Sequence, residues 1–331
     1  MALAGAGAIA AVHALAASAA GLRVVAVASA GGTSARHLAG QLDARRVSPD
    51  DLPAGADLLV VATPPDTHAE LALRGLSAGA DVLVEKPLST TLADADRLVA
   101  AAENPGAPIM RCAENLLHAP AWGAVMARRP ALGPLRHLSS RTLQPPPDWG
   151  HFARPLTAGG VLFDLGPHPV ALVLELAGEP ALAVGAELSS SRADGADDRA
   201  AVRIRFASGL VATLDVSWTA EVPEWSLQAA SDQGVVRMEL SPDVAVEADG
   251  EPVALPGRFP DAADPALGQF GYVDQLLDMA GRGATSQTVG QARTVLEVIC
   301  AGYASAARAG DEIPLPFAGD RDRTPMQLWR D

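Results

Sequence analysis

The chain has 331 residues, of which 49% are hydrophobic, and this length and composition predict a large buried core divided between two domains. Its 25 basic and 39 acidic residues give a net charge of −14, which argues against nucleic acid or an anionic membrane surface as a partner. Two cysteines are too few for a disulfide framework or a Cys-rich zinc site, so we expect a cytoplasmic protein without a metal centre.

The apolar N-terminus is interpreted as folded structure rather than as a signal peptide. Residues 1–21 lack a basic flank and carry His13 in their middle. No stretch reaches ~18 unbroken apolar residues with membrane-like flanks, so we expect no membrane association.

Strands and helices alternate through the first part of the chain. After a short strand before Gly5 and a helix up to residue 19, strands are expected over 22–29, 57–63, 81–87 and 108–115, with helices over 33–42, 65–79 and 92–104. Near-continuous aliphatic strands separated by helices are typical of a parallel sheet covered on both faces. The sequence therefore predicts an α/β domain with a doubly wound parallel sheet.

The turn after the first strand reads G-A-G-A-I-A, a variant of the dinucleotide-binding fingerprint. Its glycines allow a tight turn and the close approach of a pyrophosphate, and the next helix offers free N–H groups. Chance or simple helix packing explains the pattern equally well in a chain rich in alanine and glycine. Its position between a strand and a helix favours a cofactor site formed by Gly5, Ala6, Gly7, Ala8 and Ile9.

Two further strand ends carry candidate residues, because ligands bind beyond the carboxyl ends of strands in such sheets. Lys86 follows the fourth strand and is the only lysine in the chain, although a solvated strand-end charge is the alternative interpretation. His68 begins a predicted helix and is either structural or adjacent to the cofactor. The cofactor candidates at these ends are Thr63, Pro64, Pro65, His68, Glu85 and Lys86.

The second half of the chain has a different pattern. Residues 144–155 are proline-rich and contain Trp149 and His151 as candidate substrate contacts. Residues 201–256 read as strands joined by turns, which predicts an antiparallel sheet, and helices are expected over 270–281 and 289–310, followed by a polar tail.

Asp164 and His168 lie in an otherwise apolar segment, four residues apart. On a helix they would share one face, and a buried Asp–His pair within the core is the alternative to a catalytic role. Pro167 and Pro169 make one regular helix doubtful, so we expect a kink or a restart, with Pro167 near a helix start.

Five motifs together resemble the Gfo/Idh/MocA family of NAD(P)-dependent oxidoreductases. They are GAGAIAAVH, VVATPPDTH, VEKPLSTTLADADRLV, the pair Glu114-Asn115 and GGVLFDLGPHP, in this order and spacing. The resemblance implies an N-terminal Rossmann domain over residues 1–116 and a C-terminal α+β domain over 117–331 with an open, mostly antiparallel sheet for substrate binding and oligomerisation. It also implies a homodimer or homotetramer, with Asn115 contacting the cofactor or the substrate.

The resemblance further implies that Lys86, Asp164 and His168 meet at the substrate hydroxyl beside the nicotinamide. Hydride transfer from an alcohol requires a proton acceptor near neutral pH, which suits His168, and Lys86 would stabilise the developing alkoxide. We expect a dehydrogenase or reductase acting on a secondary alcohol or ketone of a sugar, polyol or sugar derivative. The alternative is a non-redox relative, either an NAD(P)-sensing regulator or an NAD-dependent glycosidase.

Two departures from the family pattern bear on substrate and cofactor. Ala171 stands where many relatives have a carboxylate, which puts the usual polyol contacts in doubt, and Ser29 replaces an acidic residue at the end of the second strand. No Asp or Glu occurs from Gly5 through Leu42, so we expect NADP(H) in preference to NAD(H), with tolerance of both as the alternative. Its contacts are expected from Ser29, Thr33, Ser34 and Arg36.

Overall fold

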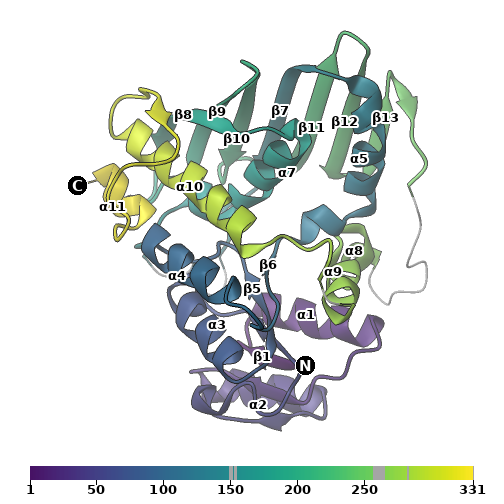
Figure 1. The fold of residues 1–331 in the computed structure, drawn as a ribbon, viewed down its shortest axis with the longest axis vertical. Helices are drawn as coiled ribbons and strands as arrows, with labels where there is room; N and C mark the ends of the chain where they lie inside the picture. Colours follow the sequence, from purple (N-terminus) through teal and green to yellow (C-terminus); the bar gives the residue numbers. More distant parts are fainter. Residues whose placement is uncertain (149–151, 153–154, 256–264, 282, 331) are drawn as a thin grey trace. The chain divides into compact units, whose positions relative to one another are not determined.

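The computed structural model describes residues 1–148, 152, 155–255, 265–281 and 283–330 (Figure 1). The chain divides into two compact units: unit 1 is Met1–Ala119 with Phe259–Arg293, and unit 2 is Pro120–Arg258 with Thr294–Asp331. The first division lies close to the boundary predicted after residue 116. The return of a late segment to unit 1 differs from the prediction, which placed everything after residue 116 in one domain.

Unit 1 is built on a parallel sheet, as the alternating pattern predicted. In the described residues its strands follow the order β3-β2-β1-β4-β5-β6, and every neighbouring pair is parallel. The two-residue strand β3 was not predicted, because it consists of exposed arginines. The strands are β1 (Ala2–Ala4), β2 (Ala26–Ala28), β3 (Arg45–Arg46), β4 (Leu58–Val61), β5 (Asp81–Glu85) and β6 (Met110–Ala113).

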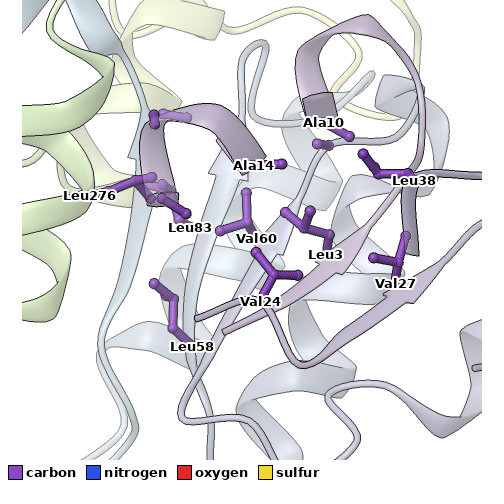
Figure 2. Close-up of a cluster of buried hydrophobic side chains, with 14 of the residues drawn as sticks. Leu3, Ala10, Ala14, Val24, Val27, Leu38, Leu58, Val60, Leu83 and Leu276 are labelled. Carbon is purple, nitrogen blue, oxygen red and sulfur yellow. The ribbon is translucent and has the colours of Figure 1, made fainter. Parts of the chain in front are cut away.

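Aliphatic side chains from the strands and helices of unit 1 form one buried cluster (Figure 2). Leu3, Val60 and Leu83 come from neighbouring strands, and Leu276 comes from the late helix α9. This shared core explains why the late segment belongs to unit 1. The helices of unit 1 are α1 (Ala8–Ala19), α2 (Gly32–Gln41), α3 (His68–Ser77), α4 (Leu92–Ala102), α8 (Pro265–Gln269) and α9 (Tyr272–Ala280), with short 3-10 turns at Pro49–Asp51, Pro65–Thr67 and Asn115–His118.

Unit 2 contains the mixed, mostly antiparallel sheet that was predicted. Its described strands follow the order β14-β13-β12-β11-β7-β10-β9-β8-β15, and β7 with β10 is the parallel pair among them. The strands are β7 (Leu135–Leu143), β8 (Ala181–Ser189), β9 (Arg199–Phe206), β10 (Val211–Ser217), β11 (Glu224–Ser231), β12 (Gly234–Ser241), β13 (Ala245–Ala248), β14 (Glu251–Pro252) and β15 (Ile313–Pro314).

Helices cover one face of this sheet, and Figure 1 shows α5 (Pro120–Leu132) and α7 (Pro167–Ala177) lying against it. Along β9 the alternation places Val202 and Ile204 in the core and leaves Arg203 exposed on the other face. The remaining helices are α6 (Val161–Asp164), α10 (Val289–Ala306), which continues from unit 1, and α11 (Pro325–Arg330), a helix in the predicted polar tail. In the described part of the chain, no helix is sufficiently long and apolar to cross a membrane.

Candidate functional site

Gly5 forms the tight turn that follows β1. Its φ of +116° is one that side chains rarely adopt, and a Cβ at this position would lie 2.1 Å from the carbonyl oxygen of Ala62. Its N–H donates to the carbonyl of Ala28 at 2.7 Å, so the turn is held between β2 and the end of β4. The backbone conformation and packing of the fold therefore require glycine at position 5, independently of any ligand.

Gly7 has a different reason to be glycine. It is the N-cap of α1, it adopts an ordinary φ of −88°, and no side chain caps the helix. A Cβ placed on Gly7 would meet no atom within 4 Å, and both Gly7 and Ala8 are exposed. Open space beside uncapped N–H groups at a helix start fits the pyrophosphate of a dinucleotide, with Ala6 and Ile9 as flanking, partly buried residues.

The segment after β2 contains the predicted cofactor hydroxyls and lies beside an arginine that was not predicted. Ser29 Oγ accepts from the N–H of Gly31 at 3.3 Å, and Ser34 Oγ donates to the carbonyl of Gly31 at 2.9 Å. Thr33 and Arg36 are exposed. Arg46, on the neighbouring strand β3, has a guanidinium nitrogen 3.0 Å from the position of a Cβ on Gly32. The sequence shows the basic pair at residues 45–46. Its position beside the segment after β2 follows from the pairing of β3 with β2, which the sequence does not reveal.

His68 connects the ends of β4 and β5. Its ring is fully buried, with Nε2 2.8 Å from the carbonyl oxygen of Thr63 and Nδ1 2.9 Å from that of Pro87. Burial lowers the pKa of His68, although both carbonyls act in the opposite direction. Thr63 also accepts a hydrogen bond from Thr67, while Pro64 is exposed and Pro65 is partly buried. The structure therefore gives His68 a bracing role between the two strand ends.

Glu85 is buried at the end of β5, where it pairs with His13 of α1. The distance from Glu85 Oε1 to His13 Nε2 is 2.7 Å, and Tyr272 of α9 meets the His13 ring edge-on at 5.9 Å between centroids. Burial raises the pKa of Glu85, but His13, Lys86 and His68 together outweigh this effect and lower it. The imidazole on an alanine-rich helix is thus the partner of the Glu-Lys-Pro glutamate, a contact that no spacing in the sequence indicates.

Lys86 directly follows β5 and is partly buried. Its backbone N–H donates to Glu85 Oε2 at 3.1 Å, and the Lys86–Pro87 bond is cis, as expected for a sharp turn at an X-Pro bond. β5 lies next to β4 and β6, and β4 lies next to β1. The glycine turn, Thr63 and Lys86 therefore lie at the carboxyl ends of adjacent parallel strands.

Asn115 was predicted to contact the cofactor or the substrate, and the structure gives its side chain an internal partner. Its Nδ2 donates to the carbonyl of Phe270 at 2.7 Å, and the residue is buried. A Cβ on Gly271 would lie 2.3 Å from the Asn115 carbonyl oxygen, so this junction is tightly packed. Asn115 thus braces the turn before α9.

In unit 2, Asp164 and His168 lie on two successive helices rather than one. Asp164 ends α6, and α7 begins at Pro167 with His168 as its second residue, which confirms the predicted restart. His168 is 6% exposed, and its ring lies 5.6 Å from that of Trp225 on β11. Trp225 was not predicted, since no spacing connects it to His168. Ala171 is buried, and the predicted contacts Trp149 and His151 lie outside the described residues.

The sheet of unit 1 and its open glycine turn define a dinucleotide-binding Rossmann protein. A family model for the oxidoreductase family with an NAD-binding Rossmann fold matches residues 1–111, and the model of the GFO/IDH/MocA C-terminal domain matches residues 126–237. The chain therefore belongs to the Gfo/Idh/MocA oxidoreductase family, as the five motifs predicted.

Two relatives of the chain are named as reductases of sugar derivatives. The chain is 35% identical over 139 residues to a dTDP-3,4-didehydro-2,6-dideoxy-α-D-glucose 3-reductase of Streptomyces antibioticus, across 41% of this chain and 42% of that protein. It is 31% identical over 186 residues to a 1,5-anhydro-D-fructose reductase of Ensifer adhaerens, across 54% and 55%. The matched stretches thus span about half of these relatives. The crystal structure of GenD2 from gentamicin A biosynthesis, in complex with NAD, superposes with a TM-score of 0.80 at 28% identity over 95% of both chains.

Proposed function

We propose that this protein is an NAD(P)-dependent oxidoreductase that acts on a secondary alcohol or ketone of a sugar, polyol or sugar derivative. The observation that carries the proposal is the position of Lys86. The only lysine of the chain follows β5 at the sheet edge that also carries the glycine turn and Thr63. A positive charge at this edge has a role in stabilising an alkoxide as it forms.

Three side chains have distinct roles in the proposed reaction. A nicotinamide cofactor bound at the glycine turn would supply the hydride acceptor or donor. His168 takes the proton of the substrate hydroxyl during oxidation and returns it during reduction, Lys86 stabilises the developing alkoxide, and Asp164 provides a hydrogen-bond acceptor for the reacting group. Trp225 packs beside the imidazole and limits the orientations it can adopt.

NADP(H) is the proposed cofactor, with NAD(H) as the weaker alternative. A carboxylate after β2 would bind the ribose 2′-OH of NAD and repel a 2′-phosphate, and Ser29 stands there instead. Arg46 beside Gly32 and the exposed Arg36 of α2 supply two guanidinium groups near the same segment. Guanidinium groups match phosphate geometry and carry a permanent positive charge.

Two relatives and one residue of this chain support a preferred substrate class. The curated relatives reduce keto groups of a nucleotide-linked deoxysugar and of an anhydrosugar, as their names state. The buried Ala171 offers no carboxylate to a polyol hydroxyl. We therefore favour a substrate with fewer free hydroxyls than inositol, such as a deoxy or anhydro sugar.

We further propose that the protein is a cytoplasmic homodimer or homotetramer assembled through the face of the unit 2 sheet that carries the exposed side chains of β7, β9 and β10. The exposed Arg203 on β9 and the salt bridge between Arg141 and Asp215, at 3.7 Å, lie on strands β7, β9 and β10. This face is polar, and its apolar alternate residues point to the core. We therefore propose ionic and hydrogen-bonded pairing between identical faces.

Net cofactor turnover tests the proposed function. The protein is incubated with NADPH or NADP+ and with a panel of dTDP-linked keto-deoxysugars, 1,5-anhydro-D-fructose and myo-inositol, and absorbance of the reduced cofactor is followed. Sustained, substrate-dependent oxidation or reduction supports the proposal. Tight cofactor binding without turnover on any member would favour a sensing role, and release of a glycosidic leaving group without net cofactor change would favour a glycosidase.

A further inference from the structure

Asp197 is a fully buried carboxylate that the proposed chemistry does not use. It lies two residues before the start of β9, and its exposed fraction is 0%. An acid in this position costs free energy unless hydrogen-bond donors satisfy it. Its surroundings therefore indicate what it stabilises.

Three consecutive N–H groups at the start of α6 donate to Asp197. Gly160 N–H donates to Oδ1 and Leu162 N–H donates to Oδ2, both at 2.8 Å. Between them, Val161 N–H donates to the backbone carbonyl of Asp197 at 2.8 Å. The first N–H groups of a helix have no partner within the helix, and here one distant residue satisfies all three.

Tyr303 of α10 completes this arrangement. Its hydroxyl donates to Asp197 Oδ1 at 2.5 Å and lies 3.0 Å from Gly160 N, and its ring packs against Trp329 of α11 with centroids 6.2 Å apart. The C-terminal segment also contributes, since Met326 N–H donates to the carbonyl of Ala158 at 2.9 Å. The approach is so close that a Cβ on Gly160 would lie 2.0 Å from the Asp197 carbonyl oxygen.

The stabilised segment leads directly to the proposed catalytic pair. Asp164 N–H donates to the Gly160 carbonyl at 3.0 Å, a helical bond of the short helix α6, which ends at Asp164. Gly166 N–H donates to the Val161 carbonyl at 3.3 Å, and α7 then starts with His168 as its second residue. Asp164 and His168 are thus within a few residues of the backbone that Asp197 holds.

We propose that Asp197 and Tyr303 are positioning residues, which act through the backbone of residues 160–162 to set the placement of Asp164 and His168. This inference rests on the proposed function for the roles of Asp164 and His168. It predicts that the pair affects turnover without touching the cofactor site, because every contact of Asp197 named above lies in unit 2. Misplacement of a reacting group by about 1 Å can cost ~100-fold in rate.

The test uses Asp197→Asn and Tyr303→Phe in the full-length protein, with Ser305→Ala as the matched control. Asn has nearly the size of Asp, but its side chain has an NH2 donor in place of one acceptor oxygen. At position 197 this donor would face a backbone N–H of the helix start, which is also a donor. Ser305 is also fully buried on α10 and holds backbone, accepting from Ala186 N–H at 2.8 Å and donating to the Asp311 carbonyl at 2.7 Å. Its contacts are elsewhere in unit 2, so it reports general loss of stability.

Two readouts are compared at the same interval below the melting temperature of each variant. Hydrogen exchange of the peptide covering residues 159–170 should accelerate in Asp197→Asn, less so in Tyr303→Phe, and not in Ser305→Ala. The kcat of Asp197→Asn should fall ~100-fold with unchanged cofactor Kd, whereas Ser305→Ala should keep wild-type kcat.

The positioning role would be overturned if Asp197→Asn showed faster hydrogen exchange with unchanged kcat. It would also be overturned if neither the exchange rate nor the kcat of this variant changed. Hydrogen exchange requires no substrate, so it also separates the two proposals. If the wild-type protein turns over no member of the panel, the proposed function fails. Exchange of residues 159–170 that is as slow in Asp197→Asn as in wild type would then overturn the inference as well.

Discussion

Glu85 has its hydrogen-bond partner, His13, 72 residues earlier in the chain. The imidazole crosses from α1 to the end of β5, so one buried contact joins the helix of the glycine turn to the strand that leads to Lys86. The two site elements of unit 1 are thereby coupled through the buried carboxylate of Glu85, whose pKa is lowered. This coupling gives the protein a specific pH dependence.

Glu85→Gln should remove part of the acid sensitivity of folding. The pKa of Glu85 is lowered on folding, so its contribution to stability is present above its ordinary value of 4.5 and is lost as the pH falls through the lower, folded value. Urea unfolding of wild type and variant should differ by about 1–3 kcal/mol at neutral pH, and the difference should shrink below pH 4.5. Glu70→Gln, at an exposed carboxylate, is the control. A difference that is constant down to the acid transition contradicts this assignment.

His168→Ala and Lys86→Ala should each lower kcat by ~100-fold or more while the Kd of the cofactor changes little. The reason is that in the proposed mechanism both groups act on charge that develops only during the reaction. His137→Ala, at an exposed histidine on β7, is the control and should retain full activity. Near wild-type turnover of either variant on an accepted substrate would remove that residue from the mechanism.

Arg46→Ala should weaken NADPH binding ~tenfold, equivalent to about 1.4 kcal/mol, and leave NADH binding unchanged. The guanidinium beside Gly32 is the expected partner of the 2′-phosphate. Arg45→Ala is the matched control, because the Arg45 guanidinium donates instead to the carbonyl of Ala54 at 2.9 Å. Equal loss of both cofactors, or equal affinities of wild type for NADPH and NADH, would refute the preference.

At the scale of single elements, the turn between β1 and α1 contains two glycines with opposite requirements. Gly5 is fixed by its φ and by the Ala62 carbonyl, whereas Gly7 faces open space. The first glycine therefore belongs to the fold, and the second is available to a ligand.

Gly5→Ala should destabilise the protein, with ~1–3 kcal/mol from backbone conformation alone and a further cost from the clash with Ala62. Gly7→Ala should cost about 1 kcal/mol or less but weaken cofactor binding by ~tenfold or more. Thermal unfolding and cofactor titration of both variants provide the comparison. Unchanged cofactor affinity in Gly7→Ala would mean that no ligand approaches this position.

Aliphatic runs predicted β4 and β5, and proline chemistry predicted the start of α7, because local sequence determines these features. β7 was missed since its sequence, LRHLSSRTL, mixes polar residues on both faces, and β3 is too short to form a pattern. The same limit applies to the site. Lys86 and the glycine turn carry local signatures, but the positions of Arg46, Trp225 and Asp197 depend on strand order and long-range contacts that no spacing rule describes.

At the scale of the whole molecule, unit 1 is completed by a segment that follows the sheet of unit 2 in sequence. Leu276 of α9 belongs to the same buried cluster as Leu83 of β5 and Ala14 of α1 (Figure 2). Removal of the chain after residue 258 would therefore expose the core of unit 1, and the N-terminal residues alone do not form a complete folding unit.

Self-association is expected through the polar face of the unit 2 sheet. Light scattering at micromolar concentration should give a mass of two or four chains. Ala201→Glu should lower this mass, because the new carboxylate would add negative charge beside Asp215, its partner in the β9–β10 pair on the exposed side of the sheet. Ala207→Glu, in the exposed turn after β9, is the control. A single-chain mass for the wild-type protein would contradict this assembly.

Isotope transfer from the cofactor tests the central claim, net hydride transfer to a sugar carbon, most directly. The protein is given a keto sugar from the panel and NADPH that carries deuterium at the transferable position of the nicotinamide ring, and the product is analysed by mass spectrometry. We predict deuterium on the new carbinol carbon in proportion to the cofactor oxidised, and loss of this transfer in His168→Ala. Cofactor that keeps its deuterium, or product that carries none, would contradict the assignment.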